Sequence, residues 1–197
     1  MIEVLNLFVT HKCELSCSFC FSKNARERHP ITNRDNIRSH NINAHKSGIE
    51  LIRYCGGEPL EEFEFLRELI LSAPSGVMLS VNTNARNLTS DMVEFFNEHD
   101  VLLQISVDGY DRGERPLINL DIDLLNSVSR LGVNQLLFFP FDVIAIKEAL
   151  PTIEFYEVSN VNWKNSAGIP LEISHISDLK LNGINYFTRE TTVWHHT

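Results

Sequence analysis

Residues 4–20 read VLNLFVTHKCELSCSFC: an apolar run and, directly after it, three closely spaced cysteines. The run Val4–Thr10 is short, apolar and bounded by polar residues, which predicts a buried strand. Cys13, Cys17 and Cys20 then fall within eight residues. Their thiols can reach one another only if the chain wraps around a common centre. The sequence therefore predicts a strand that opens into a ligand-bearing loop.

Five more apolar runs of similar length follow along the chain. They cover residues 49–55, 77–84, 101–109, 134–142 and 153–159. Most are apolar nearly throughout, a composition typical of parallel strands that are covered on both faces. Pro140 has no N–H to donate, so the fifth run is expected to end there or to lie at an edge of the sheet.

Helical patterns fill several of the gaps between these runs. We expect helices after Pro59, after Thr89 or Ser90, over residues 124–131 before Gly132, and within residues 31–48. The alternation of strand and helix predicts an α/β fold, in which crossover helices connect the strands of a parallel sheet. After residue 159 the alternation fades.

The composition is that of an ordinary globular domain. The chain has 197 residues, of which 43% are apolar, and carries a net charge of −9. An acidic chain is an unlikely partner for nucleic acid, and no apolar run approaches the about 18 residues of a membrane span. The first residues lack the basic region of a signal peptide. We expect a cytoplasmic protein, in which cysteines serve metals or catalysis before disulfides.

The three clustered cysteines offer thiolates, soft ligands that suit both iron–sulfur clusters and zinc. A 4Fe–4S cluster has four irons, so three cysteines leave one iron open to a ligand from outside the protein. Structural zinc usually takes four protein ligands. His11, two residues before Cys13, would complete such a set. Zinc therefore remains an alternative on the evidence of this segment.

Chemically distinctive segments also stand at the ends of the next three predicted strands. They are GGEP at residues 56–59, NTNAR at residues 82–86 and SVDG at residues 106–109. A glycine pair lets backbone approach a ligand closely, and the carboxylate of Glu58 can hold an ammonium group. The carboxyl ends of parallel strands share one edge, where α/β folds bind ligands. We expect these segments to meet the cysteine loop in one pocket, a convergence for which structural zinc gives no reason.

The spacing CxxxCxxC, with Phe19 directly before the last cysteine, resembles the cluster motif of the radical S-adenosylmethionine (radical SAM) superfamily. The resemblance implies that Cys13, Cys17 and Cys20 hold a 4Fe–4S cluster. It also implies that the amino and carboxylate groups of S-adenosyl-L-methionine (SAM) bind the open iron. Phe19 would pack near the adenine.

The later segments extend the resemblance. Gly56, Gly57 and Glu58 are similar to the GGE motif of that superfamily, which contacts the amino group of the SAM methionine moiety. Asn84 lies in a segment that resembles the TNG-type sequence of peptide-modifying members, with Ala85 in the place of glycine. These residues would complete the cofactor site.

Ser106 and Asp108 resemble the SxDG segment, whose polar side chains lie near the SAM ribose and carboxylate. The resemblance covers roughly residues 4–160 and implies a partial (β/α)₆ TIM-like barrel. Residues 1–197 would then be a single radical SAM core domain with a short extension over residues 161–197. Only one cysteine follows the cluster motif, so the auxiliary clusters of many peptide-modifying members have no cysteine ligands here.

The activity implied is reductive cleavage of SAM to a 5′-deoxyadenosyl radical, which abstracts hydrogen from a peptide or small-molecule substrate. An external electron donor of the flavodoxin or ferredoxin type would supply the electron. Alternatives are a glycyl-radical-enzyme activase, which needs a large protein partner, and an enzyme that modifies a nucleobase or nucleotide. A non-enzymatic alternative is a catalytically silent metal-binding partner subunit.

Overall fold

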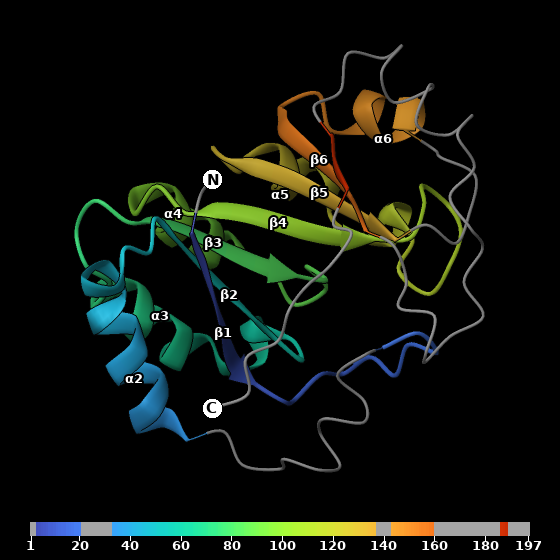
Figure 1. Ribbon diagram of the computed structural model, residues 1–197. Coiled ribbons are helices and arrows are strands. Elements are labelled where there is room, and N and C mark those ends of the chain that lie inside the picture. The colour runs from blue at the N-terminus through green and yellow to red at the C-terminus, as the bar shows by residue number, and fades with distance from the viewer. Residues whose placement is uncertain (1–2, 21–32, 137–142, 160–185, 189–197) are drawn as a thin grey trace.

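The computed structural model describes residues 3–20, 33–136, 143–159 and 186–188. Within them one sheet contains the strands β1 (Val4–Thr10), β2 (Leu51–Gly56), β3 (Met78–Thr83), β4 (Leu102–Val107), β5 (Leu131–Leu136), β6 (Ile153–Ser159) and β7 (Tyr186–Thr188). All neighbours pair in parallel and in chain order, from β1 in blue to β7 in red in Figure 1. The expected α/β class is confirmed. Among the described residues β1 and β7 are the two edges, as in a partial barrel.

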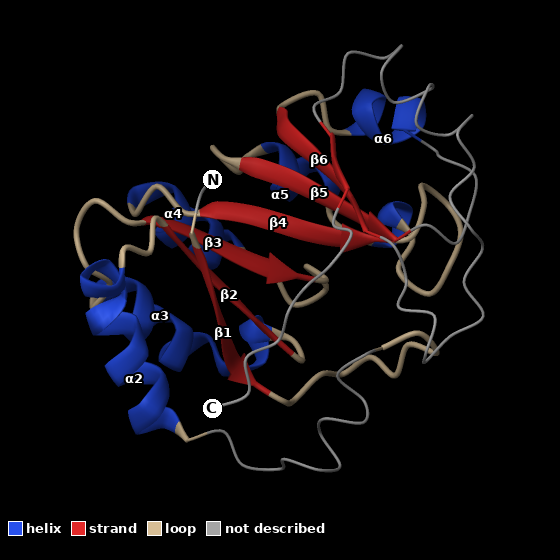
Figure 2. Ribbon diagram, in the orientation of Figure 1, coloured by secondary structure: helices blue, strands red, loops and turns tan. Residues whose placement is uncertain are grey.

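Helices connect the strands, as Figure 2 shows. They are α2 (Arg34–Asn43), α3 (Phe63–Leu71), α4 (Ser90–Glu98), α5 (Ile122–Asn126) and α6 (Val143–Ala149), with 3₁₀ turns η1 (Ala44–Ser47), η2 (Pro59–Glu62) and η3 (Leu117–Asn119). Thr89 caps α4 as expected, since its side chain accepts a hydrogen bond from the N–H of Met92. Pro59 stands at the first position of η2.

The boundary between the third expected helix and the fifth strand was wrong. The fifth strand begins at Leu131 rather than at residue 134, and α5 ends at Asn126 rather than before Gly132. Leu131 and Val133 are fully buried in the core, where Leu131 aligns with Leu103 of β4. Leu131 fits the helical spacing of Leu124 and Val128 as well as the strand alternation with Val133. Pairing with β4 decides for the strand.

The segment after residue 159 contains a strand that the sequence did not indicate. This strand, β7, pairs with β6 and extends the sheet. The sequence signal there is three residues long, too short for a periodic pattern. Pro140 and most of residues 161–197 lie outside the described residues.

The two faces of the sheet differ in polarity. One face packs against the helices, since the hydroxyl of Tyr54 donates a hydrogen bond to Asn41 of α2 at 2.8 Å. Its apolar side chains include the fully buried Ile52, Val81, Leu103, Ile105, Val107 and Val133. Alternate residues point to the other face, and these include Arg53, Ser80, Asn82 and Gln104. Ser80 and Gln104 on this second face are buried too, so the face is covered, but it is more polar than the nearly continuous apolar runs indicated.

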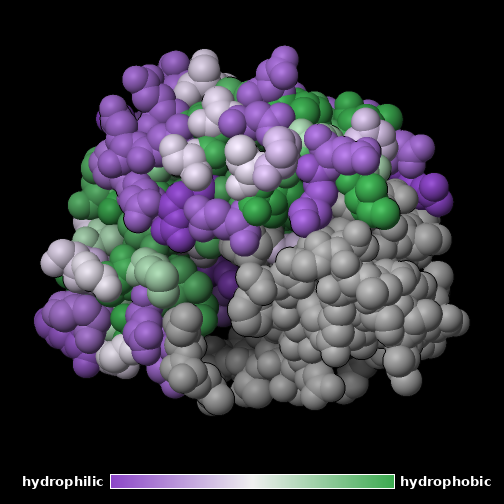
Figure 3. All heavy atoms as spheres, turned by 90° about the horizontal axis from the view of Figure 1, so that it is seen from above, coloured by the Kyte–Doolittle hydropathy of each residue, from purple (hydrophilic) through white to green (hydrophobic). Residues whose placement is uncertain are grey.

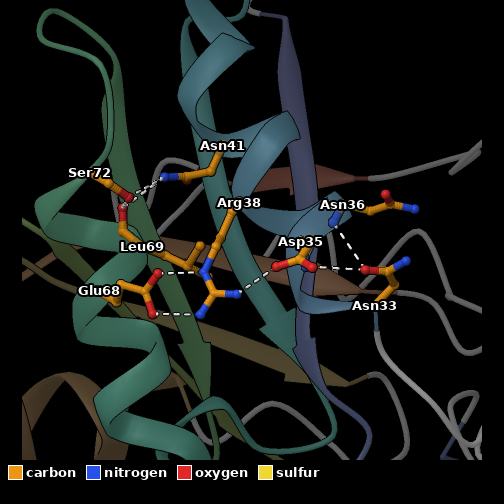
Figure 4. A network of polar contacts seen from close by, with 8 residues as sticks. All are labelled: Asn33, Asp35, Asn36, Arg38, Asn41, Glu68, Leu69 and Ser72. Atoms are coloured by element: carbon orange, nitrogen blue, oxygen red, sulfur yellow. Dashed lines mark hydrogen bonds and ion pairs between the residues drawn. The ribbon is translucent and has the colours of Figure 1, made fainter.

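A polar network joins α2 to α3 on the helical side (Figure 4). The guanidinium of Arg38 donates two hydrogen bonds to the carboxylate of Glu68, at 2.5 and 2.9 Å. The side-chain amide of Asn41, which is fully buried, donates to the carbonyl of Leu69 at 2.8 Å. The exposed pair adds little stability, whereas the buried amide fixes the register of the two helices.

The helices in the described ranges are too short or too polar to cross a bilayer. Figure 3 shows hydrophilic and hydrophobic residues interspersed over the described part of the surface that it presents. Single exposed apolar side chains such as Leu71 and Ile144 are ordinary for a protein surface.

Candidate functional site

The loops that follow β1 and β2 are joined by backbone hydrogen bonds. The N–H of Gly57 donates to the carbonyl of Thr10 at 2.8 Å, and the N–H of Glu58 donates to the carbonyl of Lys12 at 2.7 Å. Thr10 and Gly56 are also neighbours in the register of the two strands. The segment at 56–59 therefore lies directly beside the start of the cysteine loop, as the shared edge of a parallel sheet predicts.

Both glycines are required by this junction. A Cβ on Gly56 would lie 2.3 Å from the carbonyl oxygen of Thr10, and a Cβ on Gly57 would lie 2.0 Å from that of Lys12. Gly56 also has a φ of +145°, which favours glycine. The sequence suggested that the pair admits a ligand. In the structure the atoms that come close are the backbone of this chain's own cysteine loop.

Glu58 is almost fully buried, and its carboxylate is held by its own chain. One oxygen accepts hydrogen bonds from the N–H of Leu60 at 3.1 Å and the hydroxyl of Thr83 at 2.5 Å. The other accepts from the N–H of Asn84 at 2.7 Å. Burial raises the pKa of Glu58 to about 7, against the lowering effect of these donors. Glu58 thus ties the end of β2 to the end of β3.

Asn84 reaches back towards the cysteine loop, since its side-chain amide donates to the carboxylate of Glu14 at 2.7 Å. Its own oxygen accepts from the N–H of Arg86 at 2.9 Å. Ala85, where the resembled sequence has glycine, has a φ of 59°. This left-handed conformation costs a residue with a Cβ about 1 kcal/mol.

Asp108 is fully buried at the end of β4 and holds the loop that follows. One oxygen accepts from the backbone N–H groups of Glu114 and Arg115, each at 2.9 Å. The other accepts from the guanidinium of Arg115 at 2.6 and 3.1 Å. Charge-assisted bonds of this kind are strong. Ser106, two residues earlier, is partly buried and aligns with Asn134 of β5.

That loop in turn holds the cysteine loop. The carboxylate of Glu114 accepts from the backbone N–H of Ser18 at 2.9 Å and from its hydroxyl at 2.5 Å. The guanidinium carbon of Arg115 lies 4.9 Å from the centre of the Phe19 ring, a cation–π contact. The segments after β1 and β4 thus meet, although 96 residues separate Ser18 from Glu114.

The cysteines of this loop carry no disulfide bonds. Cys17 is buried, and burial raises the pKa of its thiol to about 11, although the charge of Arg115 opposes the shift. The N–H of Cys20 donates to the carbonyl of Cys17 at 3.1 Å, which closes a turn. Three thiols in one loop, beside Phe19, are the donor chemistry of an iron–sulfur site.

Within the described residues no three histidine, cysteine or acidic side chains are gathered closely enough to hold a metal ion. The loop brings Cys13, Cys17 and Cys20 to one edge of the sheet, and their side chains have to turn further to meet at one centre. A zinc site made of these cysteines and His11 would need the same rearrangement of side chains.

Sequence reasoning missed the residues that hold these segments together. Glu114 and Arg115 follow Asp108 in a polar loop and carry no spacing signal. Thr83 lies in the segment at residues 82–86, but no role for its side chain could be assigned from the sequence.

Arg53 was also missed, although the sequence contains a clue to it, because a lone cation inside an apolar strand is unusual.

Comparison with known proteins agrees with this arrangement. Residues 7–126 match the model of the Radical SAM superfamily. The chain is 23% identical over 160 residues to the uncharacterized protein MJ0907 of Methanocaldococcus jannaschii, covering 76% of this chain and 55% of that protein. It is 28% identical over 115 residues to the GTP 3′,8-cyclase of Rhodococcus opacus, covering 55% and 32%. The chain thus spans about half of the first relative and a third of the second.

Among solved structures, SuiB of Streptococcus suis bound to its precursor peptide SuiA has a TM-score of 0.74 and 17% identity. The match covers 95% of this chain and 49% of that one. At this identity the likeness concerns the fold. The family match takes in more than half of the chain, including the three cysteines and the segments after β2, β3 and β4. The chain belongs to the radical SAM superfamily.

Proposed function

We propose that this chain holds a 4Fe–4S cluster on Cys13, Cys17 and Cys20, binds SAM at the open iron, and abstracts hydrogen from a substrate. When bound together, the cluster and SAM supply reductive cleavage of the sulfonium C–S bond. The protein positions these groups and excludes water, and an external donor of the flavodoxin or ferredoxin type supplies the electron.

The observation that carries the proposal is the junction between the cysteine loop and the segment at 56–59. Two backbone hydrogen bonds, from Gly57 to Thr10 and from Glu58 to Lys12, hold the two motifs of the family side by side. Both glycines are sterically required there, because a Cβ at either position would clash with the backbone of Thr10 or Lys12. The two glycines therefore have a structural reason to be present in this motif.

The remaining residues receive roles that fit their contacts. Phe19, held from one side by Arg115, offers its ring to the adenine. Asn84 and Ser106 offer polar atoms near the ends of β3 and β4. Asp108 is satisfied by the loop it holds, so we assign it a positioning role towards SAM. Glu58 likewise positions the ends of β2 and β3.

The substrate is a peptide or a small molecule. The likeness to SuiB, a structure solved with a precursor peptide, supports a peptide through fold alone. A nucleotide is the second candidate, favoured by the sequence similarity to GTP 3′,8-cyclase. A peptide library and a set of nucleoside triphosphates, each incubated with the reduced enzyme and SAM, separate the two by the mass of the product.

The proposal is tested by anaerobic iron–sulfur reconstitution, followed by reduction with dithionite in the presence of SAM. We expect the wild type to bind about four irons and to release 5′-deoxyadenosine. Cys17→Ala should do neither. Cys55→Ala, a cysteine change outside the loop, is the matched control for iron content. A wild type that purifies with one zinc, or a cluster that never cleaves SAM, would reject the proposal.

A further inference from the structure

A second polar group of this chain lies on the sheet face opposite the helices, in the middle of β2 and from the middle of β3 towards its end. Arg53 of β2 and Ser80 of β3 are register neighbours, so their side chains share a face. Asn82 stands two residues further along β3, on the same side. The alternate residue Tyr54 bonds to Asn41 of α2. The group therefore faces the interior of the partial barrel.

The buried polar atoms of this group have no hydrogen-bond partner among the residues that the structure describes. They are Nε and Nη1 of Arg53, Oγ of Ser80 and Oδ1 of Asn82. Ser80 as a whole is only 1% exposed. Buried polar groups in folded proteins are nearly always satisfied, and exceptions point to a ligand or to ordered water.

Arg53 differs from two other partly buried arginines, Arg115 and Arg130. Arg115 pairs with Asp108 at 2.6 Å, and Arg130 pairs with Glu154 at 3.1 Å. The ion pairs found within the described ranges do not include Arg53. Arg53 is partly buried as a residue, but its Nε and Nη1 are shielded from solvent. Such a cation is costly to leave unpaired, so its retention indicates an anion from elsewhere.

The position of Arg53 separates it from the proposed SAM site. It stands three residues before Gly56, which at the rise of a strand is about 10 Å from the carboxyl end of β2. The residues assigned to SAM lie at or beyond that end. An anion that meets Arg53 is therefore deeper in the barrel than the groups at the edge.

We infer that Arg53, Ser80 and Asn82 form a substrate subsite for an oxyanion, a carboxylate or a phosphate, that also carries a hydrogen-bond donor. The guanidinium provides N–H donors to the oxyanion, and the Ser80 hydroxyl adds another. The Asn82 oxygen only accepts, so it requires a hydroxyl or N–H on the same molecule. The assignment to substrate rests on the proposed function, whereas the anion site itself does not.

The anion site is tested by thermal unfolding of the purified protein with inorganic pyrophosphate and, separately, succinate as probes. One of the two should raise the melting temperature of the wild type, and which one does identifies phosphate or carboxylate. Arg53→Met should melt no lower than the wild type without probe. Its affinity for the probe should fall roughly ten- to a hundredfold.

Two further variants control this result. Arg130→Met removes an arginine that already has a carboxylate partner, and it should keep the probe response. Arg53→Lys keeps the charge without the planar guanidinium. Its rise in melting temperature with the probe should lie between those of the wild type and Arg53→Met, and it replaces Arg53→Met in the test if that variant does not fold. An absent response in the wild type, or an equal response in Arg53→Met, would overturn the anion site.

The source of the anion is decided by the KM for SAM in 5′-deoxyadenosine release by the reconstituted enzyme without substrate. Arg53→Met should leave this KM within about twofold of the wild type. A large rise would place the SAM carboxylate at Arg53 and overturn the substrate assignment. A wild type that releases no 5′-deoxyadenosine rejects the proposed function alone, because the unfolding experiment judges the anion site independently.

Discussion

At the scale of single residues, two buried carboxylates hold the loops around the candidate site. Glu58 accepts hydrogen bonds from the end of β3, and Asp108 accepts four from Glu114 and Arg115. Neither side chain points freely at a ligand. A buried carboxylate needs hydrogen-bond donors wherever it lies. The two carboxylates that the motifs suggested for ligand binding therefore also hold neighbouring segments of the chain together.

Glu58 makes stability depend on pH. Its pKa is raised from 4.5 to about 7 by burial, so the native state holds a proton that the unfolded state has lost between these values. The stabilisation by Glu58 is then present below about pH 4.5 and is lost as the pH rises through 7. Between pH 5 and pH 8 the wild type should lose up to about 3 kcal/mol relative to Glu58→Gln.

Urea unfolding of both proteins at the two pH values measures this difference. Glu61→Gln, an exposed carboxylate in the same turn, is the matched control. An identical gap between the wild type and Glu58→Gln at pH 5 and pH 8 would contradict a raised pKa.

Arg115 is expected to be critical because it neutralises a carboxylate that has no access to water. Asp108 is 0% exposed in its side chain, and Arg115 is 15% exposed. Arg115→Leu leaves that charge buried without its partner, which should lower the free energy of unfolding by about 3–5 kcal/mol. Chemical denaturation measures the loss.

Two comparisons make the Arg115 result specific. The double variant Arg115→Leu with Asp108→Asn should recover part of the stability, because it removes the unpaired charge. Arg112→Leu, at an exposed arginine of the same loop, should change the free energy by less than about 1 kcal/mol. Equal losses in the two single variants would argue against a buried ion pair.

Among the elements, α2 is joined to both α3 and β2 by one buried amide. Asn41 donates to the carbonyl of Leu69 in α3 (Figure 4). It also accepts from the Tyr54 hydroxyl of β2, so a single side chain joins three elements. The sequence pattern of residues 31–48 is weakly periodic and polar. It identified a helix there without indicating that this asparagine is its anchor.

Asn41→Ala should therefore cost about 2 kcal/mol of stability, since it leaves the Tyr54 hydroxyl and the Leu69 carbonyl without their best partner. Asn43→Ala should cost much less, because the Asn43 side chain forms only local bonds at the surface, to the carbonyl of Ser39 and from the ammonium of Lys46. A thermodynamic cycle with Tyr54→Phe measures the coupling. Additive effects of Asn41→Ala and Tyr54→Phe would contradict the bond between them.

At the scale of the whole molecule, the hydrophobic core and the cysteine loop are separate. The core cluster lies on the helical side of the sheet and, within the described part of the chain, contains none of Cys13, Cys17 and Cys20. The loop is attached through hydrogen bonds at the edge and through Arg115 and Glu114. Cluster binding should thus add to stability without being a condition for folding.

Removal of iron from the reconstituted protein by a chelator tests this separation. We expect the melting temperature to fall by about 5–10 °C, while far-ultraviolet circular dichroism keeps its α/β signature. The Cys17→Ala variant should show the lower temperature from the start and no response to the chelator. Loss of the signature on chelation would mean that the cluster is part of the folding core.

Local patterns in the sequence were enough to predict the order of the first six strands, their parallel sheet and the four motifs at its edge. These properties follow from local apolar periods and from the rule that parallel strands end together. The residues that hold these motifs in place were identified from contacts in the folded chain. The pairing of Glu114 with Ser18, of Arg115 with Asp108, and the isolation of Arg53 depend on contacts between segments far apart in the chain. No local pattern encodes such contacts, because they arise when separate strands reach the same edge or face of the sheet.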